Sequence, residues 1–509
     1  MSQRQYVTTE PGAFQRIPRA LFVAFAVIVA GLGGCTAGPD FHAPAPPEDN
    51  AYTIPQATPA VHTSGIAGTQ GQQFIAGAAV PRDWWRLFHS SAVDALVAQA
   101  LVRNPGLKAA QAAVRAAHET MLAQLGTFYP ALSATASASR QQAAETLAPF
   151  PNFPAVPQEF LYNLFTPQVQ VSYSPDLFGA GRRTHESLQA QAQGARFEML
   201  ATRTTLESNV VVTAIEVASL RAQEDATRRL VALERQSLAV MELRARKGDA
   251  SLLDIAAQRS QLAQAQAQLP PLAKQRAVTE HALATLLGVG PNPPPGTDLD
   301  LHDLRLPTQL PVSLPSRLVA QRPDILQARA NLHAASAAIG IAAAERFPDI
   351  TLTANLGNTA LEIAHLFSSG SGVWGITASL TAPIFAGGAL AHQEQAAKAA
   401  YVAAAQQYRT TVLGAFQNVA DVLSALNEDA RALQTADDAE RAAHTTLHLA
   451  RLELRFGRVS TLEVLTAQQG YQQAVTALVQ ARTSRYTDTA ALYQAIGGWW
   501  QAPRQAGNT

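Results

Sequence analysis

The sequence predicts a mainly α-helical chain with a smaller β part, arranged as a tandem duplication. Two proline-free stretches, at about 182–269 and 389–494, have helical composition and are too long to fit inside one globular domain. Each contains one turn of the form Gly-x-x-Ser-x-Leu-Asp/Glu, beginning at Gly248 and at Gly457. A helix followed by two alternating strands precedes each stretch, so we expect two copies of one structural unit.

Composition narrows the classes of protein to which this chain can belong. The 509 residues carry 38 Lys and Arg against 38 Asp and Glu. The chain therefore lacks the basic excess that would indicate nucleic-acid binding and the acidic excess that would indicate disorder. Only 15% of the residues are charged. Alanine and glutamine fill the helical faces instead, and small side chains let helices approach closely along their length.

The N-terminus has the features of an export signal. Basic residues precede an apolar run over 20–32, which is shorter than the roughly 20 residues of a membrane-spanning helix. The run ends at Leu-Gly-Gly-Cys, and this Cys35 is the one cysteine in the chain. We expect 1–34 to be a lipoprotein signal peptide and Cys35 to be lipidated. An ordinary signal peptide with an incidental cysteine is the alternative.

The mature chain is expected to begin with an extended segment at 35–85, rich in proline, alanine and glycine. The Trp84–Trp85 pair near its end is expected to be a packing anchor. The first structural repeat, 86–289, then begins with a helix that ends before Pro130. Its further expected elements are strands at about 131–140 and 165–176 and long helices at about 181–247 and 251–287.

Two features of these long helices lead to specific expectations. Pro270 and Pro271 must break or kink the second helix, because proline cannot donate a backbone hydrogen bond. Further, Leu233, Val240 and Leu243, with Gln236 between them, have the 3-4-3 spacing of a coiled-coil seam. We therefore expect this row of residues to face the partner helix.

A proline-rich linker at 290–316 separates the first repeat from the second, 317–498. Pro105 and Pro130 recur as Pro323 and Pro348, and a single offset relates both pairs, which is hard to obtain by chance. The expected elements of the second repeat are strands at about 349–357 and 373–384 and long helices at about 388–455 and 460–496, followed by a C-terminal tail at 499–509.

Two further matches support the duplication. The motif Pro-Asp-Leu-Phe-Gly-Ala-Gly at 175–181 is similar to Ala-Pro-Ile-Phe-Ala-Gly-Gly at 382–388. The offset between the turn glycines, Gly248 and Gly457, recurs between Gly288 and Gly497 at the far ends of the stretches. Each repeat therefore contains a helix, a strand pair, a long helix, a turn and a second long helix.

The expected strands alternate apolar and polar residues, as Val169 and Val171 do with Gln168 and Gln170. Four such strands cannot close a barrel alone, and an open edge in lipid would leave backbone groups without hydrogen-bond partners. Three chains would supply twelve strands, so a barrel shared by a homotrimer is the simplest solution. The long helices, each about 100 Å at 1.5 Å per residue, would continue it as a hollow cylinder.

Short motifs in a fixed order cover nearly the whole mature chain. They are Cys35–Phe41, Asp83–Trp85, Asn104–Pro105, Phe128–Pro130, Arg322–Ile325, Phe347–Pro348, Pro383–Phe385, Gly457–Ser460 and Gly497–Trp500. As an ordered set they resemble the outer-membrane efflux protein family of TolC-like channel-tunnels, in particular its NodT-type or OprM-like lipoprotein branch.

The resemblance implies a trimer with a twelve-stranded barrel in the outer membrane and a twelve-helix tunnel in the periplasm. It also implies docking to a periplasmic adaptor, or membrane fusion protein, and to an inner-membrane pump of the RND type. The chain would then be a lipid-anchored passive exit duct for small molecules such as drugs or toxic organics, with no catalysis and no cofactor.

The two turns are the candidate sites of contact with the adaptor. A tight turn between helices needs a residue that tolerates positive φ, which favours Gly248 and Gly457. Ser251 and Ser460 are expected helix N-caps, and Arg458 is expected to face the adaptor. The basic residues near the turns could equally be solvated charges at helix C-termini.

The resemblance also implies a periplasmic gate just inside the turns. Asp254 matches an acidic position of relatives, whereas the second turn has Thr466 at such a position and Glu463 one turn earlier. Three copies would bring carboxylates near one axis, where they would raise one another's pKa and attract cations. The alternative is that Asp254 and Glu463 only cap helix N-termini.

Other functions are less consistent with the sequence. His444 and His448 have the spacing of metal ligands on a helix, but no third ligand is evident and no metal is expected. The sequence has neither a nucleophile elbow nor a phosphate-binding loop, the motifs that would indicate an enzyme. A periplasmic coiled-coil adaptor, or the same duct serving type I-like secretion, are the alternatives that stay open.

Overall fold

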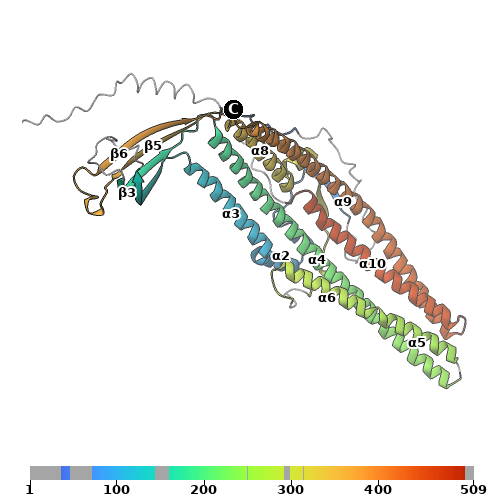
Figure 1. Ribbon diagram of the computed structural model, residues 1–509. Helices are drawn as coiled ribbons and strands as arrows, with labels where there is room; N and C mark the ends of the chain where they lie inside the picture. Colours follow the sequence, from blue (N-terminus) through green and yellow to red (C-terminus); the bar gives the residue numbers. More distant parts are fainter. Residues whose placement is uncertain are drawn as a thin grey trace, which may run out of the picture. The chain divides into compact units, whose positions relative to one another are not determined.

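The computed structural model describes residues 36–45, 71–143, 160–248, 250–291, 298–312 and 315–498. Cys35, the expected signal peptide at 1–34 and the expected tail at 499–509 lie outside the described residues. The chain forms two compact units, and each draws on both sequence repeats (Figure 1). The first unit contains the described parts of 1–41, 120–189 and 334–401, and the second contains those of 42–119, 190–333 and 402–509.

The first unit contains a four-stranded antiparallel sheet in the order β2-β3-β5-β6. β3 starts before the expected 165, because every residue of 160–165 except Asn163 is apolar or aromatic, which hides the strand period. β6 ends before the expected 384, ahead of Pro383, which cannot donate to a ladder. The strands are β2 (Ala131–Ala143), β3 (Phe160–Tyr173), β5 (Asp349–Asn358) and β6 (Gly372–Thr381).

Helices make up most of the described chain. None of the described helices combines the length and the apolarity that crossing a membrane requires. The α-helices are α2 (Ser91–Arg103), α3 (Pro105–Gly126), α4 (Ala180–Arg246), α5 (Leu252–Ala267), α6 (Leu269–Leu286), α7 (Pro315–Gln321), α8 (Pro323–Ala344), α9 (Ala389–Arg455) and α10 (Thr461–Ala495). Short 3₁₀ helices are η1 (Trp84–Phe88), η3 (Leu301–Asp303) and η4 (Ile363–His365).

The long helices α4 and α9 are equivalent over their whole length. Both have 67 residues, and both start directly after a glycine with positive φ, Gly179 at 84° and Gly388 at 86°. These two glycines are therefore equivalent, whereas the sequence match between 175–181 and 382–388 pairs Gly388 with Gly181. That match is wrong by two positions. It aligns Leu-Phe with Ile-Phe, but the glycine with positive φ is what fixes where each helix begins.

The first hairpin contains the expected break. α5 ends at Ala267 and α6 begins at Leu269, with Pro270 and Pro271 in the first turn of α6. Proline is tolerated there because N–H groups in the first turn have no intrahelical partner. The prolines therefore divide the expected helix at 251–287 into two.

The expected coiled-coil seam is covered only in part within one chain. Leu233 is half-buried and lines a cavity with residues of α10, whereas Val240 and Leu243 are 57% and 47% exposed. The buried residues of this part of α4 include Leu230, Val231 and Met241. Spacing alone allows several stripes on one helix, and the partner helices decide which stripe is covered.

Of the linker expected at 290–316, residues 298–312 pack into the core of the second unit. Its strand β4 (Gln309–Val312) pairs in parallel with β1 (Gln73–Ala76), from the segment expected to be extended. Trp84 is fully buried and stacks on Tyr493 with ring centroids 4.9 Å apart, which confirms the packing anchor. The linker adds the buried residues Leu299, Leu301, Leu304, Leu306, Leu310 and Val312 to the same core.

Candidate functional site

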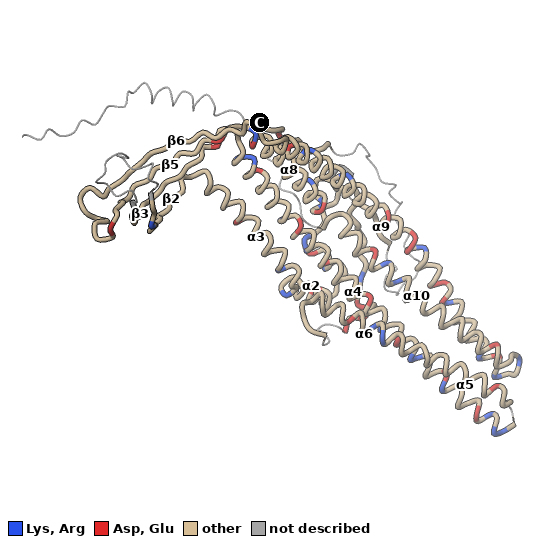
Figure 2. The backbone as a smooth tube through the Cα atoms, viewed as in Figure 1, with Lys and Arg blue, Asp and Glu red and all other residues tan. Residues whose placement is uncertain are grey.

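The two faces of the four-stranded sheet have opposite polarity, because the registers align residues of one kind across all strands. Next to each apolar row lies a polar one, and the strands carry almost no charge (Figure 2). One apolar row is Leu132, Val171, Ala354 and Ile376, and the next is Ala134, Val169, Leu356 and Trp374. The row between them is polar on three strands, with Ser133, Gln170 and Asn355, and has Gly375 on β6.

The apolar face is uncovered. Leu132, Leu356, Trp374 and Ile376 are between 67% and 78% exposed. β2 and β6 are the edges of the sheet, and within the described residues each pairs with a strand on one side only. Such a surface is unstable in water, since it exposes a broad apolar patch and two rows of unpaired backbone groups.

The two hairpin turns are nearly identical in conformation. Gly248 and Gly457 adopt φ of 83° and 70°, as the sequence predicts. Gly248 donates its N–H to the carbonyl of Ala245, and Gly457 donates to that of Leu454. A Cβ at either glycine would meet no atom within 4 Å, so the backbone conformation is what requires glycine here.

Each helix that follows a turn begins with a capping box. The Ser251 hydroxyl accepts the Asp254 N–H at 3.1 Å, while the Asp254 carboxylate accepts the Ser251 N–H at 3.1 Å. Ser460 and Glu463 repeat the arrangement, with the Glu463 N–H donating to the Ser460 hydroxyl at 3.4 Å. Capping is therefore one role of both acidic residues.

The surroundings of Asp254 favour its ionised form. Hydrogen-bond donors hold the pKa of Asp254 below its ordinary value. The largest effect comes from the Ser251 hydroxyl, followed by the Ser251 N–H and the Thr461 hydroxyl of the second hairpin. Asp254 is half-buried and Glu463 is exposed. Thr466 is exposed, and its hydroxyl donates to the carbonyl of Leu462 at 2.9 Å.

The tips expose large apolar side chains. Leu252 and Leu253 are 83% and 79% exposed, and Leu462, at the position equivalent to Leu253, is 69% exposed. Arg458 is also exposed; its guanidinium lies 5.7 Å from the centroid of the Phe456 ring. These side chains form an apolar surface at the first turn and a mixed apolar and basic surface at the second.

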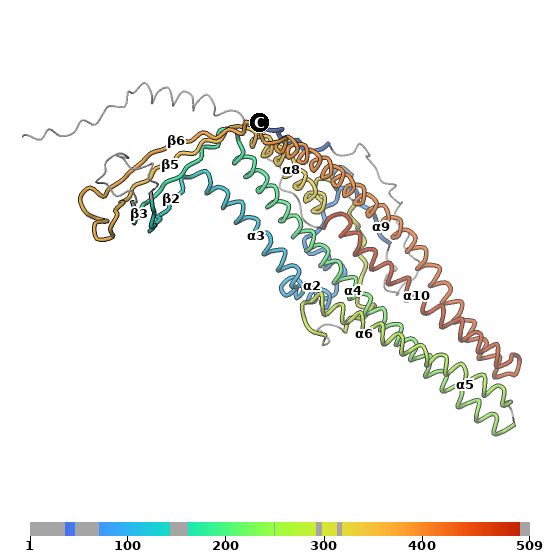
Figure 3. Tube along the Cα trace, in the orientation of Figure 1, coloured from blue at the N-terminus to red at the C-terminus, as the bar shows by residue number. Residues whose placement is uncertain are grey.

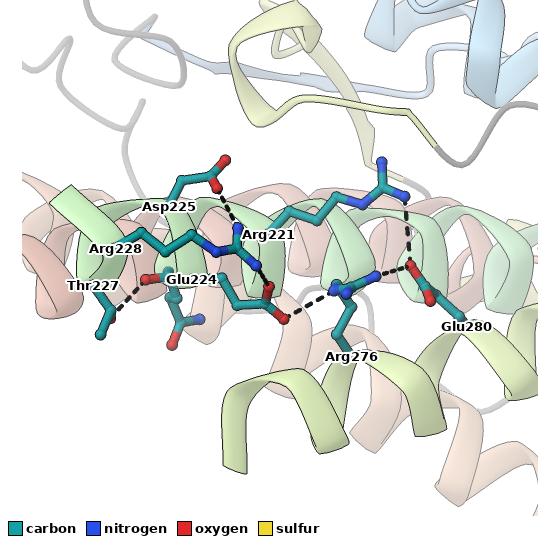
Figure 4. A network of polar contacts seen from close by, with 8 residues as sticks. Arg221, Glu224, Asp225, Thr227, Arg228, Arg276 and Glu280 are labelled. Carbon is teal, nitrogen blue, oxygen red and sulfur yellow. Dashed lines mark hydrogen bonds and ion pairs between the residues drawn. The ribbon is translucent and has the colours of Figure 1, made fainter. Parts of the chain in front are cut away.

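A network of ion pairs holds α4 and α6 together (Figure 4). Glu224, whose side chain is 2% exposed, pairs with Arg228 on its own helix and with Arg276 of α6 at 2.9 Å. Arg276 continues to Glu280 at 2.8 Å, and Glu280 pairs with Arg221 at 3.4 Å. Because Glu224 is buried and paired on both sides, this network fixes the two helices laterally.

A buried acid, Glu234, and a half-buried one, Asp429, lie between helices, and the sequence reasoning missed both. Burial raises the pKa of Glu234 on α4, although Gln258 of α5 donates to its carboxylate. Burial and the neighbouring carboxyl of Asp488 raise the pKa of Asp429 to about 7, while Arg485 acts in the opposite direction. An acidic residue on the apolar stripe of a helix is the one available sequence indication.

A polar cavity of about 490 Å³ lies between α4, α5 and α10. Its lining includes eight glutamines, among them Gln264 and Gln472. Gln468 is 2% exposed, and neither of its amide atoms has a hydrogen-bond partner within the described residues. The one sequence indication of this cavity is the glutamines at helical spacing on α5 and α10.

His444, considered above as a metal ligand, lies against an aromatic ring. Its ring centroid is 5.6 Å from that of Tyr471 on α10, in an edge-to-face arrangement. A search of the described residues finds no group of three or more potential metal ligands.

Comparisons with known proteins agree with this geometry. The model of the family described as "Outer membrane efflux protein" matches residues 96–289 and 314–498. The pyoverdine export outer membrane protein OpmQ of Pseudomonas putida is 31% identical over 450 residues, covering 88% of this chain and 95% of that protein. The antibiotic efflux pump outer membrane protein ArpC of Pseudomonas putida is 31% identical over 498 residues, covering 95% and 98%.

A solved structure of the outer-membrane channel OprN superposes with a TM-score of 0.78 at 26% identity, covering 91% of this chain and all of that one. An apolar sheet face and long helical hairpins, on a TolC-like fold, define an outer-membrane channel-tunnel. This chain belongs to the outer membrane efflux protein family. It is an outer-membrane exit duct of an efflux system, which rules out the alternative of a periplasmic adaptor.

Proposed function

We propose that three copies of this chain form the duct, and that the duct completes a tripartite pump with a periplasmic adaptor and an RND-type inner-membrane pump. The observation that carries the proposal is the two-faced sheet with two unpaired edges. A closed sheet of twelve strands would leave no edge in lipid, where an unpaired backbone group costs several kcal/mol. Four strands cannot enclose a channel by themselves.

The polarity of the two faces supports the orientation of the sheet. The apolar face, with Trp374 and Ile376, would contact the lipid of the outer membrane. The polar face, with Gln170 and Asn355, would line the water-filled interior. This alternation is the pattern of transmembrane strands, in which lipid-facing and lumen-facing residues follow each other along the chain.

Lipidation of Cys35 would anchor the same part of the chain. Residues directly after it are held firmly: Arg183 at the start of α4 donates to the carbonyls of Ala37 at 3.0 Å and Gly38 at 3.3 Å, and pairs with Asp40 at 2.9 Å. Gly38 lies so close to Gly340 of α8 that a Cβ on Gly38 would come within 2.3 Å of the Gly340 Cα. A lipid on Cys35 would therefore attach beside the base of the sheet.

The hairpin turns are the proposed docking surface for the adaptor. Gly248 and Gly457 shape the turns, and Ser251 and Ser460 start the helices that follow them. Arg458 and the exposed leucines offer contacts to a partner, and exposed apolar patches with a polar rim are typical of interaction sites.

The gate of the tunnel is proposed to lie just inside the same turns. Asp254 and Glu463 occupy equivalent positions in the two repeats, so three copies would supply a ring of carboxylates from both hairpins. Thr466 lies one turn further along α10, where it would widen or polarise the ring without adding charge. Carboxylate rings of this kind attract and retain cations.

Small organic molecules are the proposed cargo, because relatives named for pyoverdine export and for antibiotic efflux share most of the chain. The test is a deletion strain complemented with wild-type chain, profiled against drugs, solvents and secreted peptides, with native mass analysis of the purified channel. Drug sensitivity of the deletion strain together with a trimer is expected. A monomer, or a strain that only loses a secreted polypeptide, would contradict the proposal.

A further inference from the structure

The glutamine-lined cavity between α4, α5 and α10 has a buried floor and an open rim. In the two hairpins α5 runs back along α4, and α10 runs back along α9 (Figure 3). Glu234 of α4 and Gln468 of α10 form the floor, and they are 3% and 2% exposed. The rim consists of exposed glutamines, namely Gln264, Gln268, Gln469, Gln473 and Gln480. A solute can therefore reach the floor past the rim.

The amide of Gln468 lacks a partner at both ends. Its Oε1 and Nε2 atoms are buried, and neither makes a hydrogen bond within the described residues. Buried polar groups in folded proteins are hydrogen-bonded as a rule, so this amide needs a partner from outside the chain. That partner must donate to Oε1 and accept from Nε2, and the requirement is the same whichever way the amide is turned.

Glu234 adds a carboxylate to the same floor. Gln258 of α5 donates to one of its oxygens, and Arg451 of α9 favours the ionised form through its field. Burial has the larger effect and raises the pKa of Glu234. Among the described residues, none of the side chains that line the cavity is basic. A cation bound at the floor would therefore offset the hydration that the carboxylate loses.

The duplication indicates that the hairpin fold does not require this buried acid. The offset that relates the two turn glycines also relates both ends of α4 to those of α9. It places Ala443 of the second repeat at the position of Glu234, and Ala467 at the position of Gln258. The second hairpin therefore forms with alanine at both positions. Since a buried carboxylate without a paired cation disfavours folding, its presence in the first hairpin needs another reason.

We propose that this cavity binds a small hydroxylated ammonium compound of the amino-sugar class, with its ammonium group at Glu234 and its hydroxyls at Gln468 and the glutamines of the rim. A hydroxyl both donates and accepts, as the two amide atoms of Gln468 require. The ammonium supplies the positive charge that the lining lacks. The cavity of about 490 Å³ lies within the range of about 300–1,000 Å³ that is usual for small-molecule sites.

Other classes of ligand match the floor less well. An anion would meet the Glu234 carboxylate without a basic side chain to balance it. A metal ion or a polyamine would satisfy Gln468 only at Oε1 and would leave Nε2 without an acceptor. The site is formed by one chain alone, so it depends neither on the proposed trimer nor on the proposed cargo.

The ligand would also bridge the two hairpins. At the rim, Gln472 of α10 donates to the side-chain oxygen of Gln268, next to the break between α5 and α6. At the floor, Glu234 belongs to the first hairpin and Gln468 to the second. A compound bound to both would extend this contact from the rim to the floor, and it should slow hydrogen exchange in α5 and α10.

Calorimetric titration of the purified full-length channel with glucosamine at pH 7 tests the site. N-Acetylglucosamine keeps the hydroxyls but has no charge, and spermidine has the charge but no hydroxyls. Glucosamine is expected to bind saturably at one site per chain, and each comparison compound should bind at least tenfold more weakly. Hydrogen exchange with and without glucosamine locates the protected helices.

Two variants remove the two halves of the floor. Glu234→Ala introduces the residue that the second repeat has at this position, and Gln468→Leu replaces an unsatisfied amide by an apolar side chain, so both should keep the wild-type Tm. Each should weaken glucosamine binding at least tenfold. Glu428→Gln, an exposed site on α9, should leave binding unchanged. Asp254→Asn with Glu463→Gln should also leave it unchanged, which separates the cavity from the carboxylates near the turns.

Tenfold weaker binding in both floor variants, with wild-type Tm and protection of α5 and α10, would support the site. A folded wild-type channel that binds no glucosamine would overturn it, since the cavity would then hold only water. Equal binding of N-acetylglucosamine or of spermidine would overturn the ligand class. Undiminished binding in both floor variants, or binding lost in the Asp254 and Glu463 variant, would place glucosamine elsewhere and overturn the site. None of these outcomes affects the proposed efflux function, which the deletion strain tests separately.

Discussion

The carboxylate of Asp254 accepts two hydrogen bonds from Ser251, one from the backbone N–H at 3.1 Å and one from the hydroxyl at 2.7 Å. The same hydroxyl accepts the Asp254 N–H. This reciprocal contact fixes the first turn of α5 directly at the tip of the hairpin. The equivalent box at Ser460 and Glu463 does the same for α10.

Removing both caps should loosen the tips. Ser251→Ala with Ser460→Ala is expected to cost about 1 kcal/mol at each helix start, because one backbone N–H loses its acceptor. Hydrogen exchange of the amides at Asp254 and Glu463 should then accelerate about fivefold. Ser484→Ala, at an exposed position inside α10, is the matched control and should change nothing near the tips. Unaltered protection at both amides would contradict the stabilising role of the caps.

Neutralising the acidic ring should change conduction. Asp254→Asn with Glu463→Gln is expected to weaken block by divalent cations in single-channel recordings, because the proposed ring loses its charge. The pKa of Asp254 lies below its ordinary value, so the carboxylate stays ionised as the pH falls to 5. Cation sensitivity that depends on Asp254 should therefore persist at pH 5.

Glu428→Gln provides the control, since Glu428 is an exposed acid on α9, far along the sequence from the turn. If the double variant keeps wild-type conductance and cation sensitivity, Asp254 and Glu463 only cap their helices.

Asp429 should make stability depend on pH. Its pKa is raised to about 7 in the fold, above the value of about 3.9 in an unfolded chain, because burial and Asp488 disfavour the ionised form. The associated stability is fully present below pH 4 and is lost as the pH rises through 7. Asp429→Asn should flatten the decline in Tm between pH 5 and pH 8. Asp421→Asn, an exposed site on the same helix, should leave it unchanged.

Glycine-to-alanine changes should have opposite signs at two kinds of position. Gly457→Ala should destabilise the hairpin by about 1 kcal/mol, since φ of 70° is strained for any residue with a Cβ. Gly414→Ala should stabilise the chain by about 0.5–1 kcal/mol, because Gly414 lies inside α9 and a Cβ there meets no atom within 4 Å. Thermal unfolding followed by helical circular dichroism measures both. A stabilising Gly457→Ala would be inconsistent with the turn geometry.

Glu224 should be the most sensitive residue of the network between α4 and α6. Glu224→Ala is expected to cost about 2 kcal/mol of unfolding free energy, less than a fully buried pair, because the Arg228 side chain is 55% exposed. Glu428→Ala removes an exposed pair with Arg431 and should cost under about 0.5 kcal/mol. A double-mutant cycle of Glu224 with Arg276 measures the coupling free energy of that pair. Equal losses of unfolding free energy in Glu224→Ala and Glu428→Ala would refute the distinction between the buried and the exposed pair.

Local chemistry explains why much of the architecture was predictable. The long helices follow from proline-free composition, the break before α6 from Pro270 and Pro271, and the turns from glycines followed by Ser-x-x-acid. The strand pairs follow from alternation, apart from the start of β3, where apolar and aromatic residues occupy both alternating positions, with Asn163 as the exception. Each of these features is encoded within one or two turns of chain.

Long-range contacts explain what could not be predicted. The pairing of β1 with β4 joins Gln73 to Gln309 across almost half of the chain. The sequence of neither segment indicates which strand it will pair with. The buried stripe of α4 contains Leu230 and Val231 instead of the expected Val240 and Leu243, because the neighbouring helices cover that side. The Asp488 carboxyl that helps to raise the pKa of Asp429 also lies on another helix, α10.

The sequence by itself determined the duplication, the periods of its elements and the tight turns, because these depend on residue spacing and backbone preference. Only the tertiary structure decided the registers of the sheet, the corrected alignment at Gly388 and the cavity at which Glu234 and Gln468 meet. Register depends on which strands lie side by side, and a sequence pattern with a period of two fits many registers equally well.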